Sequence, residues 1–565
     1  MIHDRVPSGT DPAADVAIVG GGPAGISLAL SLARRGIRVC LLESGDVRFD
    51  GPSQALARGE LDAPLYPRLH EATVRALGGS TWSWGGVCTE PESLVFEPRE
   101  WVPTAGWPIE RSELDRYAAA ALELCGIDPE GREETRELVE WAFIEAGVDR
   151  LRLEPIPLYF GRPVRFGETY RDDLALEPTL DVFLGSTVTG LEVEGGAVTA
   201  AIGSSRGEGF RVRAREFVVC GGGIETPRLL LVSGIGGPAV GRNFMEHPRF
   251  VERFRVRPGT TPLGDLLRSG RVGARRLMRL ALSERIRREE GLLNWHADMQ
   301  FGYAGQDDET WLAVRRLAIA VRAPWNESPY FQDAGGGRVR IRAEDLATAL
   351  QRPDKSVLGI VGALTQRPGL RRWLEVSSSV EQTPDPENRI ELMDERDALG
   401  MPRVRVRWSI GAREERTFRR GAEILGEELR RLEPDIEPAD PDAGDPWPDQ
   451  LVGTWHQLGT TRMDDDPSKG VVDRNLRVHG LANLSVSSGA VFPVSGSGPP
   501  TVTIVQLSLR LADRLAARLG AAASVGGATS VGAAALSGSW SATPDDAPAA
   551  TPAADGRQWL RTPQS

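Results

Sequence analysis

Three glycines and one acidic residue near the start of the chain have the types and spacing for binding a dinucleotide. Gly20, Gly22 and Gly25 form a G-x-G-x-x-G pattern, and Glu43 follows 18 residues after the last glycine. The first glycine permits a tight turn, the second lets the backbone approach a pyrophosphate, and the third lets a helix pack closely on a sheet. Glu43 is placed to accept hydrogen bonds from a ribose diol, and an acid there argues against NADP.

A second stretch, Val74–Gly86, has the glycine pairs Gly78-Gly79 and Gly85-Gly86 on either side of two tryptophans and three hydroxyl residues. Such a loop can lie flat against an aromatic ring while its backbone N–H groups face polar edges. The alternative is a packing turn, and the stretch alone does not separate the two.

The elements around the glycine pattern decide its interpretation. Val16–Val19 and Ile37–Leu42 are predicted as buried strands, with a helix over Ile26–Arg35 between them. Because a lone glycine pattern also occurs in ordinary turns, this strand–helix–strand context is what favours dinucleotide binding.

Later segments are predicted to resume the same sheet. Phe217–Cys220 is expected to be a strand, followed by a glycine-rich turn and a helix over Arg228–Ser233 with Pro227 in its first turn. Leu484–Ser488 is expected to be another strand, and Pro500–Leu519 a long helix.

The middle of the chain has a different pattern. Leu266–Glu290 is predicted as a solvated amphipathic helix, and Ala412–Leu432 as a charge-rich helix. Between and beside them, alternation of apolar and polar residues predicts an antiparallel sheet with one covered face. Its expected strands are Asn294–Tyr303, Trp311–Val321, Arg338–Arg342, Trp373–Glu381, Arg389–Met393 and Val404–Ser409.

Composition limits the classes of function. The 565 residues carry a net charge of −12 with a pI near 5.3, which argues against nucleic acid and anionic membranes as partners. The chain contains no signal-like or membrane-spanning apolar run, so a cytoplasmic protein without a membrane segment is expected. Four scattered cysteines predict neither a metal site nor a disulfide framework. Residues 521–565 have the composition of a disordered tail.

The chain resembles the glucose–methanol–choline (GMC) oxidoreductases, a family of FAD-dependent sugar and alcohol oxidases and dehydrogenases. Within it, the bacterial sugar and polyol dehydrogenases and the pyranose-oxidase-like enzymes are the most similar. The resemblance rests on seven pieces in one order: GGGPAG with Glu43, RALGGSTWSWGG, GGGIETPRLL, GRNFMEHP, EQTPDPENRIEL, HQLGTTRM with GVVD, and VFPVSGSGPPTVTIVQLSLRLAD.

The resemblance implies an α/β fold with two domains. A Rossmann-like FAD-binding domain would be built from the discontinuous segments 14–125, 176–249 and 452–520, with a flavin loop at 77–88. A substrate domain with an antiparallel sheet would occupy residues 250–451.

The resemblance also implies roles for particular residues. His456 matches the active-site histidine of the family, although without the motif around it a structural histidine in a turn would be preferred. His247 and His479 lie in other motifs and are interpreted as loop-packing residues. The implied contacts of FAD are Gly20, Gly22, Gly25 and Glu43, then Gly79, Ser80, Trp84 and Gly85 of the flavin loop, with Val188, Ser488, Gly489, Ala490 and Thr501.

Two positions depart from the family pattern. Some relatives attach FAD through a histidine of the flavin loop, but here the corresponding residue is Ser83, so non-covalent FAD is expected. The second catalytic residue of the family, an Asn or His, aligns with Pro499, and proline offers no hydrogen-bond donor.

The expected function is oxidation of a CH–OH group of a sugar, polyol or natural-product alcohol, with His456 as base and O₂ or an electron carrier as acceptor. Three alternatives stay open: altered or non-redox, lyase-like chemistry on the same fold, an NAD-dependent dehydrogenase, and a catalytic subunit that passes electrons to a carrier. Substrate candidates in the middle of the chain are Trp295, His296, Gln300 and Gln382, and the two aromatics are more simply explained as core.

Overall fold

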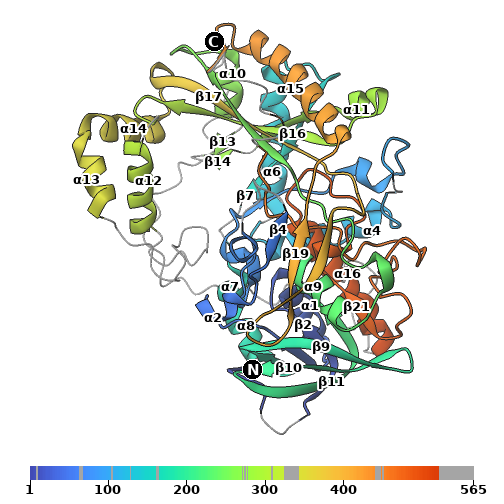
Figure 1. Cartoon of the computed structure of the whole chain (residues 1–565). Coiled ribbons are helices and arrows are strands. Elements are labelled where there is room, and N and C mark those ends of the chain that lie inside the picture. Colours follow the sequence, from blue (N-terminus) through green and yellow to red (C-terminus); the bar gives the residue numbers. More distant parts are fainter. Residues whose placement is uncertain are drawn as a thin grey trace.

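The computed structural model is shown in Figure 1. Its described residues are 1–7, 11–62, 68–103, 106–127, 129–160, 164–269, 271–272, 275–276, 278–306, 309–322, 343–439, 447 and 451–520. The strand predicted at Arg338–Arg342 and the tail predicted at 521–565 lie outside these ranges.

An eight-stranded sheet forms one half of the molecule, and its strand order is β1-β8-β3-β2-β11-β10-β9, with β21 beside β11. The strands β1, β8, β3, β2, β11 and β21 pair in parallel, while β11, β10 and β9 form an antiparallel meander. Their bounds are β1 (Ile2–His3), β2 (Ala13–Val19), β3 (Val39–Leu42), β8 (Leu180–Phe183), β9 (Ser186–Glu194), β10 (Ala197–Ser205), β11 (Glu208–Val219) and β21 (Leu484–Val486). Distant parts of the chain therefore build one parallel core, which confirms the predicted fold class.

Helix α1 (Pro23–Ala33) follows β2 and packs against α16 (Thr501–Leu519). Its close approach to the strand requires glycine. A Cβ on Gly25 would lie 1.9 Å from the carbonyl oxygen of Gly20, and Gly20 itself has a φ of +108°. The third glycine of the motif therefore has the packing role that its position predicted.

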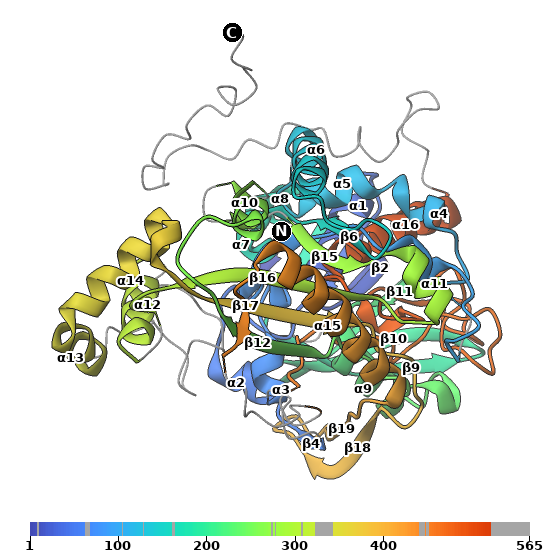
Figure 2. The ribbon, with the colours of Figure 1, turned by 90° about the horizontal axis from the view of Figure 1, so that it is seen from above.

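A six-stranded antiparallel sheet forms the second half, in the order β20-β12-β17-β16-β15-β6. The bounds are β6 (Leu153–Pro157), β12 (Arg249–Arg255), β15 (Met278–Leu282), β16 (Trp295–Tyr303), β17 (Arg371–Val380) and β20 (Glu437–Pro438). Helix α15 (Ala412–Leu432) covers one face of this sheet (Figures 1 and 2), and Gly421 of the helix lies directly against the Trp295 ring. Trp295 is 1% exposed and belongs to the core, not to a substrate site.

A small sheet of β4 (Glu60–Asp62), β18 (Arg389–Arg396) and β19 (Pro402–Arg407) lies beside α9 (Gly222–Val232). The remaining helices are mostly short and surround the two large sheets. They are α2 (Gly51–Ala55), α3 (Leu69–Ala72), α4 (Arg111–Asp115), α5 (Ala118–Leu124), α6 (Pro129–Glu145), α7 (Phe166–Thr169) and α8 (Arg171–Leu176). Two short strands, β5 (Val87–Cys88) at the end of the flavin loop and β7 (Tyr159–Phe160), pair with each other.

Two predictions about the middle segment are wrong. Leu266–Glu290 is not one helix, because β15 lies inside it and pairs with both β6 and β16. The flanking helices are α10 (Pro262–Ser269) and α11 (Glu284–Glu290), and Ser283 caps α11 by accepting a hydrogen bond from Ile286 N.

The strand predicted at Trp311–Val321 is helix α12 (Glu309–Arg322). It packs against α13 (Ala343–Gln351) and α14 (Pro353–Thr365), and the three helices project from the side of the molecule in both views (Figures 1 and 2). Leu, Ala and Arg are good helix formers, and the main contacts of this segment are with two other helices. Among the described residues, no helix combines the length and apolarity needed to span a membrane.

The start of α9 also differs from the prediction. The helix begins at Gly222, so Pro227 lies inside it rather than in its first turn. An interior proline removes one backbone donor, and the carbonyl of Gly223 loses its usual partner as a result. The side chain of Thr460 takes that place, since its Oγ1 donates to Gly223 O over 2.7 Å.

Candidate functional site

One large cavity, of about 980 Å³, lies between the two main sheets. Its walls combine the carboxyl ends of the parallel strands, the starts of α1 and α16, and the uncovered face of the antiparallel sheet. The predicted site residues that line it are Gly20, Gly22, Glu43, Gly79, Ser80, Trp84, Gly85, Val188, His456, Ser488, Gly489 and Thr501. Gly25 and Ala490 do not line it, and they support neighbouring backbone instead.

The N-terminus of α1 opens into this cavity. Gly22 is its N-cap residue, no side chain caps the helix, and a Cβ built on Gly22 would meet nothing within 4 Å. Uncapped backbone N–H groups and the positive end of the helix dipole therefore face open space. An anionic pyrophosphate fits there.

Glu43 lies at the end of β3 and connects two turns. Its Oε2 accepts a hydrogen bond from Gly21 N and its Oε1 accepts one from Gly45 N, each over 2.7 Å. Burial raises the pKa of Glu43, and the hydrogen bonds from Gly45 and Gly21 oppose that rise. Because each carboxylate oxygen accepts more than one hydrogen bond, Glu43 keeps capacity for a ligand hydroxyl.

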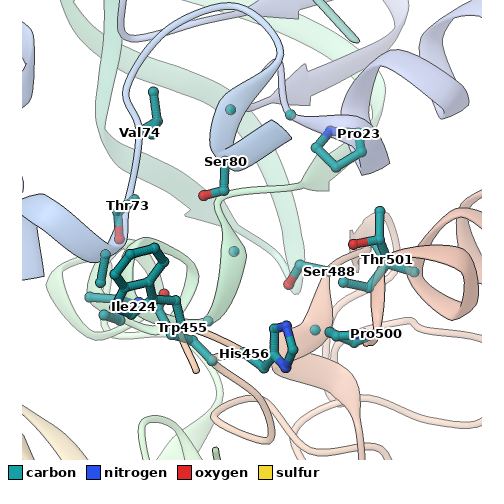
Figure 3. A pocket seen from close by; sticks show the side chains of 18 of the residues that line it. Pro23, Thr73, Val74, Ser80, Ile224, Trp455, His456, Ser488, Pro500 and Thr501 are labelled. Atoms are coloured by element: carbon teal, nitrogen blue, oxygen red, sulfur yellow. The ribbon is translucent and has the colours of Figure 1, made fainter. Parts of the chain in front are cut away.

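The predicted flavin loop is held rigidly against the glycine turn. It includes a 3₁₀ helix, η1 (Gly79–Trp82), and Gly78 N donates to Gly21 O over 2.7 Å. Trp84 Nε1 donates to Val164 O, and Arg165 donates to Trp84 O. These bonds hold Ser80 and Trp84 at the cavity wall, as Figure 3 shows for Ser80.

At the other end of the cavity, His456 makes a direct contact with a second histidine. Its Nδ1 lies 2.8 Å from Nδ1 of His247, while Nε2 of His247 lies 3.2 Å from the carbonyl oxygen of Ser495. His456 also lies near Pro500 and Ser488 in Figure 3, close to the N-terminus of α16. His247 was expected to be a loop-packing residue, and the structure instead brings it to the predicted active-site histidine.

These distances determine where the ring protons lie. A carbonyl oxygen only accepts, so Nε2 of His247 carries its proton and Nδ1 of the neutral ring is an acceptor. Nδ1–H of His456 must then be the donor between the rings, which leaves Nε2 of His456 unprotonated. Burial lowers the pKa of His247 to about 4. Burial also lowers the pKa of His456 well below its usual value, and His247 and Arg279 lower it further.

Glu246 anchors this pair, and sequence reasoning gave it no role. Its Oε2 accepts hydrogen bonds from the backbone N–H groups of Thr454 and His456 and from the Thr454 hydroxyl. It is fully buried directly before His247 in the GRNFMEHP motif. In the sequence, the only feature that could have indicated this role is the position of Glu246 directly before a histidine in that motif.

The other predicted candidates have structural roles. Gln382 is buried and connects Glu246 N, Trp408 and Ser409. Gln300 donates to Glu375, and His479 Nε2 donates to Asp464 O outside the cavity. His296, in contrast, lines the cavity.

The cavity fits FAD. It offers an uncapped helix N-terminus for phosphates at one end and a second uncapped one, that of α16, near His456. The open space beside Gly22 and the carboxylate of Glu43 match a dinucleotide, and the loop that contains Trp84 lines the cavity.

Comparison with known protein families agrees with this geometry. A profile of FAD-dependent oxidoreductases matches residues 15–263, and the GMC oxidoreductase profile matches residues 384–508. The chain therefore carries an FAD-dependent oxidoreductase domain followed by a GMC oxidoreductase C-terminal domain. It is accordingly an FAD-dependent oxidoreductase, and the predicted resemblance and the FAD cofactor are confirmed, while non-covalent attachment of FAD stays a prediction.

Several named sugar oxidases and dehydrogenases are similar in sequence. The chain is 25% identical to paromamine 6′-oxidase of Streptomyces fradiae, with 89% of this chain and 92% of the relative covered. It is 26% identical to the fructose dehydrogenase large subunit of Gluconobacter japonicus over 54% of this chain and 48% of the relative. A C-glycoside 3-oxidase of Arthrobacter globiformis is 24% identical over 66% of this chain and 61% of the relative. The alignments to the last two thus span about half and three fifths of the relatives' lengths.

Among solved structures, the formate oxidase of Aspergillus oryzae shares the fold. It is 18% identical, has a TM-score of 0.53, and the alignment covers 90% of this chain and 99% of the oxidase.

Proposed function

We propose that this GMC oxidoreductase oxidises a CH–OH group of a sugar or polyol to a carbonyl, with His456 as the base. The observation that supports the proposal most strongly is the 2.8 Å contact between Nδ1 of His456 and Nδ1 of His247, from which the tautomer of His456 follows. Its Nδ1 is used in the bond to His247, so its Nε2 has a lone pair at the cavity wall.

The proton step follows from this arrangement. Nε2 of His456 would take the hydroxyl proton, and the resulting imidazolium would keep its Nδ1–H bond to the neutral His247 ring. The lowered pKa values of both rings keep them neutral at pH 7, so no acid–base step is needed before a substrate binds. Glu246 would hold the backbone of His456 in position during the transfer.

Bound FAD would supply a hydride acceptor for the carbinol hydrogen. Helix α16 begins at Thr501 with Pro500 as its N-cap and no side-chain cap, so its N–H groups remain available at this end of the cavity. Such a helix end stabilises negative charge. Ser83 at the position of the linking histidine supports non-covalent attachment.

The substrate class is proposed from the relatives and from the second sheet. The similar proteins are named as oxidases or dehydrogenases of paromamine, fructose and C-glycosides. The sheet wall of the cavity presents polar side chains, namely Arg249, Ser379, His296, Asp298 and Arg279. Hydroxyl-rich sugars suit such a wall.

The experiment is anaerobic bleaching of the flavin. The purified protein is mixed with a panel of sugars, polyols and glycosides, and the absorbance of oxidised flavin is followed. We expect at least one alcohol to bleach it, and acid should release FAD from the polypeptide. Retained FAD that no alcohol reduces would contradict the proposal and favour non-redox chemistry. Peroxide formation on admitting air, against reduction of a dye, then distinguishes oxidase from dehydrogenase.

A further inference from the structure

We propose that His296 is a second substrate-contacting residue, and that His296 and His456 together select alcohols with two neighbouring hydroxyl groups. The inference rests on the proposed function, because it concerns the substrate of the same cavity. It also accounts for Pro499, which removed the second hydrogen-bonding residue that the family pattern predicts.

His296 lies on the cavity side of the antiparallel sheet. In β16 it pairs with Ser379 of β17, which in turn pairs with Arg249 of β12. Residues directly opposite one another in neighbouring strands share a face, and all three line the same cavity as His247 and His456. Pro499 lines the cavity as well, and His296 and Pro499 also line one small adjoining pocket, so His296 lies near the position where a partner was lost.

A chain of hydrogen bonds fixes the tautomer of His296. Ser497 Oγ lies 2.6 Å from Glu92 Oε1, and Glu92 Oε2 pairs with Arg287 over 2.9 Å. The carboxylate accepts the single hydroxyl proton of Ser497, so that hydroxyl acts as acceptor toward Nδ1 of His296, 3.0 Å away. His296 is therefore protonated on Nδ1 and has a lone pair on Nε2.

The remaining nitrogen of His296 is available for a ligand. Among the described residues, Nε2 has no hydrogen-bond partner, although the residue is only 2% exposed. Burial lowers the pKa of His296 well below its usual value, and Arg279 lowers it further, so the ring is neutral at pH 7. His296 is also close enough to His456 to lower the pKa of that ring.

The two rings thus present two acceptors to one substrate. His456 Nε2 and His296 Nε2 each require an O–H or N–H donor, and Pro499 supplies none. An alcohol with one hydroxyl group satisfies one imidazole and leaves the other unpaired or bonded to trapped water. Two adjacent hydroxyl groups, as on a sugar ring, satisfy both. Loss of the second hydroxyl should slow flavin reduction by about 10- to 100-fold in kcat/KM.

The first test measures the tautomers without any substrate. The chain has only six histidines, so a holoenzyme labelled with ¹⁵N-histidine gives a simple long-range ¹H–¹⁵N spectrum. His296→Phe and His456→Ala identify the two signals by their loss. We expect both rings to be neutral with the proton on Nδ1. A proton on Nε2 of His296 would overturn the proposal, whatever the enzyme oxidises.

The second test measures selectivity with anaerobic flavin reduction. The probes are trans-1,2-cyclohexanediol against cyclohexanol, and the fastest glycoside of the panel against its monodeoxy forms. In each pair, the wild type should react about 10- to 100-fold faster in kcat/KM with the compound that carries both neighbouring hydroxyl groups. His296→Phe keeps a ring of similar size and leaves the Ser497–Glu92 bond intact, so it should lower the diol rate to that of the deoxy compound. His479→Gln, outside the cavity, should keep the wild-type preference.

The outcomes separate the two proposals. Equal loss for diol and deoxy compound in His296→Phe would assign a structural role to His296 and overturn the inference alone. Unchanged preference in that variant would mean that another residue contacts the second hydroxyl. If no probe reduces the flavin, the proposed oxidation fails, while the tautomers of His296 and His456 still decide whether two acceptors face the cavity.

Discussion

His456 depends on its neighbours for the protonation state in which it would meet a hydroxyl group. The carbonyl of Ser495 sets the proton of His247, and His247 in turn sets the proton of His456. Glu246 holds the backbone at both ends of this pair. The base proposed here is thus prepared by three groups that themselves never need to contact the substrate.

The first prediction tests the base directly. His456→Ala should slow flavin reduction by roughly 10²–10⁴-fold, the usual contribution of a positioned general base. FAD content should not change, because the glycine turn and Glu43 lie at the other end of the cavity. Stopped-flow reduction with a working alcohol measures the rate. The matched control is His479→Ala, and a near-normal rate in His456→Ala would contradict the assignment.

The second prediction concerns stability and pH. The folded-state pKa of His247, about 4, lies below the ordinary value of 6.5, so the unfolded chain binds more protons than the folded one between these two values. The contribution of His247 to the free energy of unfolding is therefore fully present above pH 6.5 and is lost as the pH falls toward 4. At pH 5 the loss is about 2 kcal/mol.

Urea unfolding of the wild type and His247→Asn at pH 7 and pH 5 checks this. The variant should lose less stability on acidification than the wild type. Buried carboxyls with raised pKa values, such as Glu43, act in the opposite direction, but they are common to both proteins and cancel in the difference. Equal losses in both proteins would contradict the prediction.

At the scale of elements, α9 shows how one motif supports another. Pro227 removes the donor that Gly223 O would use within the helix, and Thr460 of the HQLGTTRM motif replaces it. The hydroxyl of Thr460 is fully buried and contacts α9, not the cavity. Part of that motif therefore serves the packing of α9.

The third prediction is a double-mutant cycle on this contact. Thr460→Val should destabilise the protein by about 1–3 kcal/mol, because it leaves a buried carbonyl without a donor. Pro227→Ala restores an N–H that can bond to Gly223 O. In that background the cost of Thr460→Val should fall clearly below its cost in the wild type. Equal costs in both backgrounds, measured by denaturant unfolding, would show that the carbonyl is not what Thr460 satisfies.

Local patterns predicted the elements that carry strong periodicity. The β2–α1–β3 unit, α15 and α16 follow from glycine positions and apolar spacing, and the structure has them within a few residues. Local patterns failed where pairing with distant strands determines the secondary structure. The Met278–Leu282 segment is a strand because it pairs with β6 on one side and with β16 on the other. Glu92, His296 and Ser497 could not be grouped from the sequence, since 405 residues separate the first from the last.

At the scale of the whole molecule, the cavity joins two sheets that no single chain segment builds. Its lining residues range from Val19 to Ile504, and Figure 1 shows the parallel sheet in the lower half of the molecule and the antiparallel sheet in the upper half. A buried ion pair, Arg99 with Glu381, adds a further tie between the segment after the flavin loop and the end of β17. FAD bound there would contact residues from distant parts of the sequence.

The last prediction follows from the expected position of FAD between the two sheets. FAD binds the folded protein and not the unfolded chain, so removing it should lower the melting temperature, and adding it back should raise it with increasing FAD concentration. At 100 times Kd the gain is about 2.7 kcal/mol.

Hydrogen exchange of holo and apo protein locates the effect. Protection on binding should appear in peptides covering residues 20–26, 79–86 and 501–504, which lie at the cavity wall or directly beneath it, and not in α12 or α14. Gly426→Ala provides a control for a glycine substitution, because a Cβ at that position in α15 meets nothing within 4 Å and should leave the FAD dependence unchanged. Gly25→Ala places a Cβ against the Gly20 carbonyl and should abolish that dependence. A Gly25→Ala protein that still gains stability with FAD would show that the turn of α1 is not where the phosphates bind.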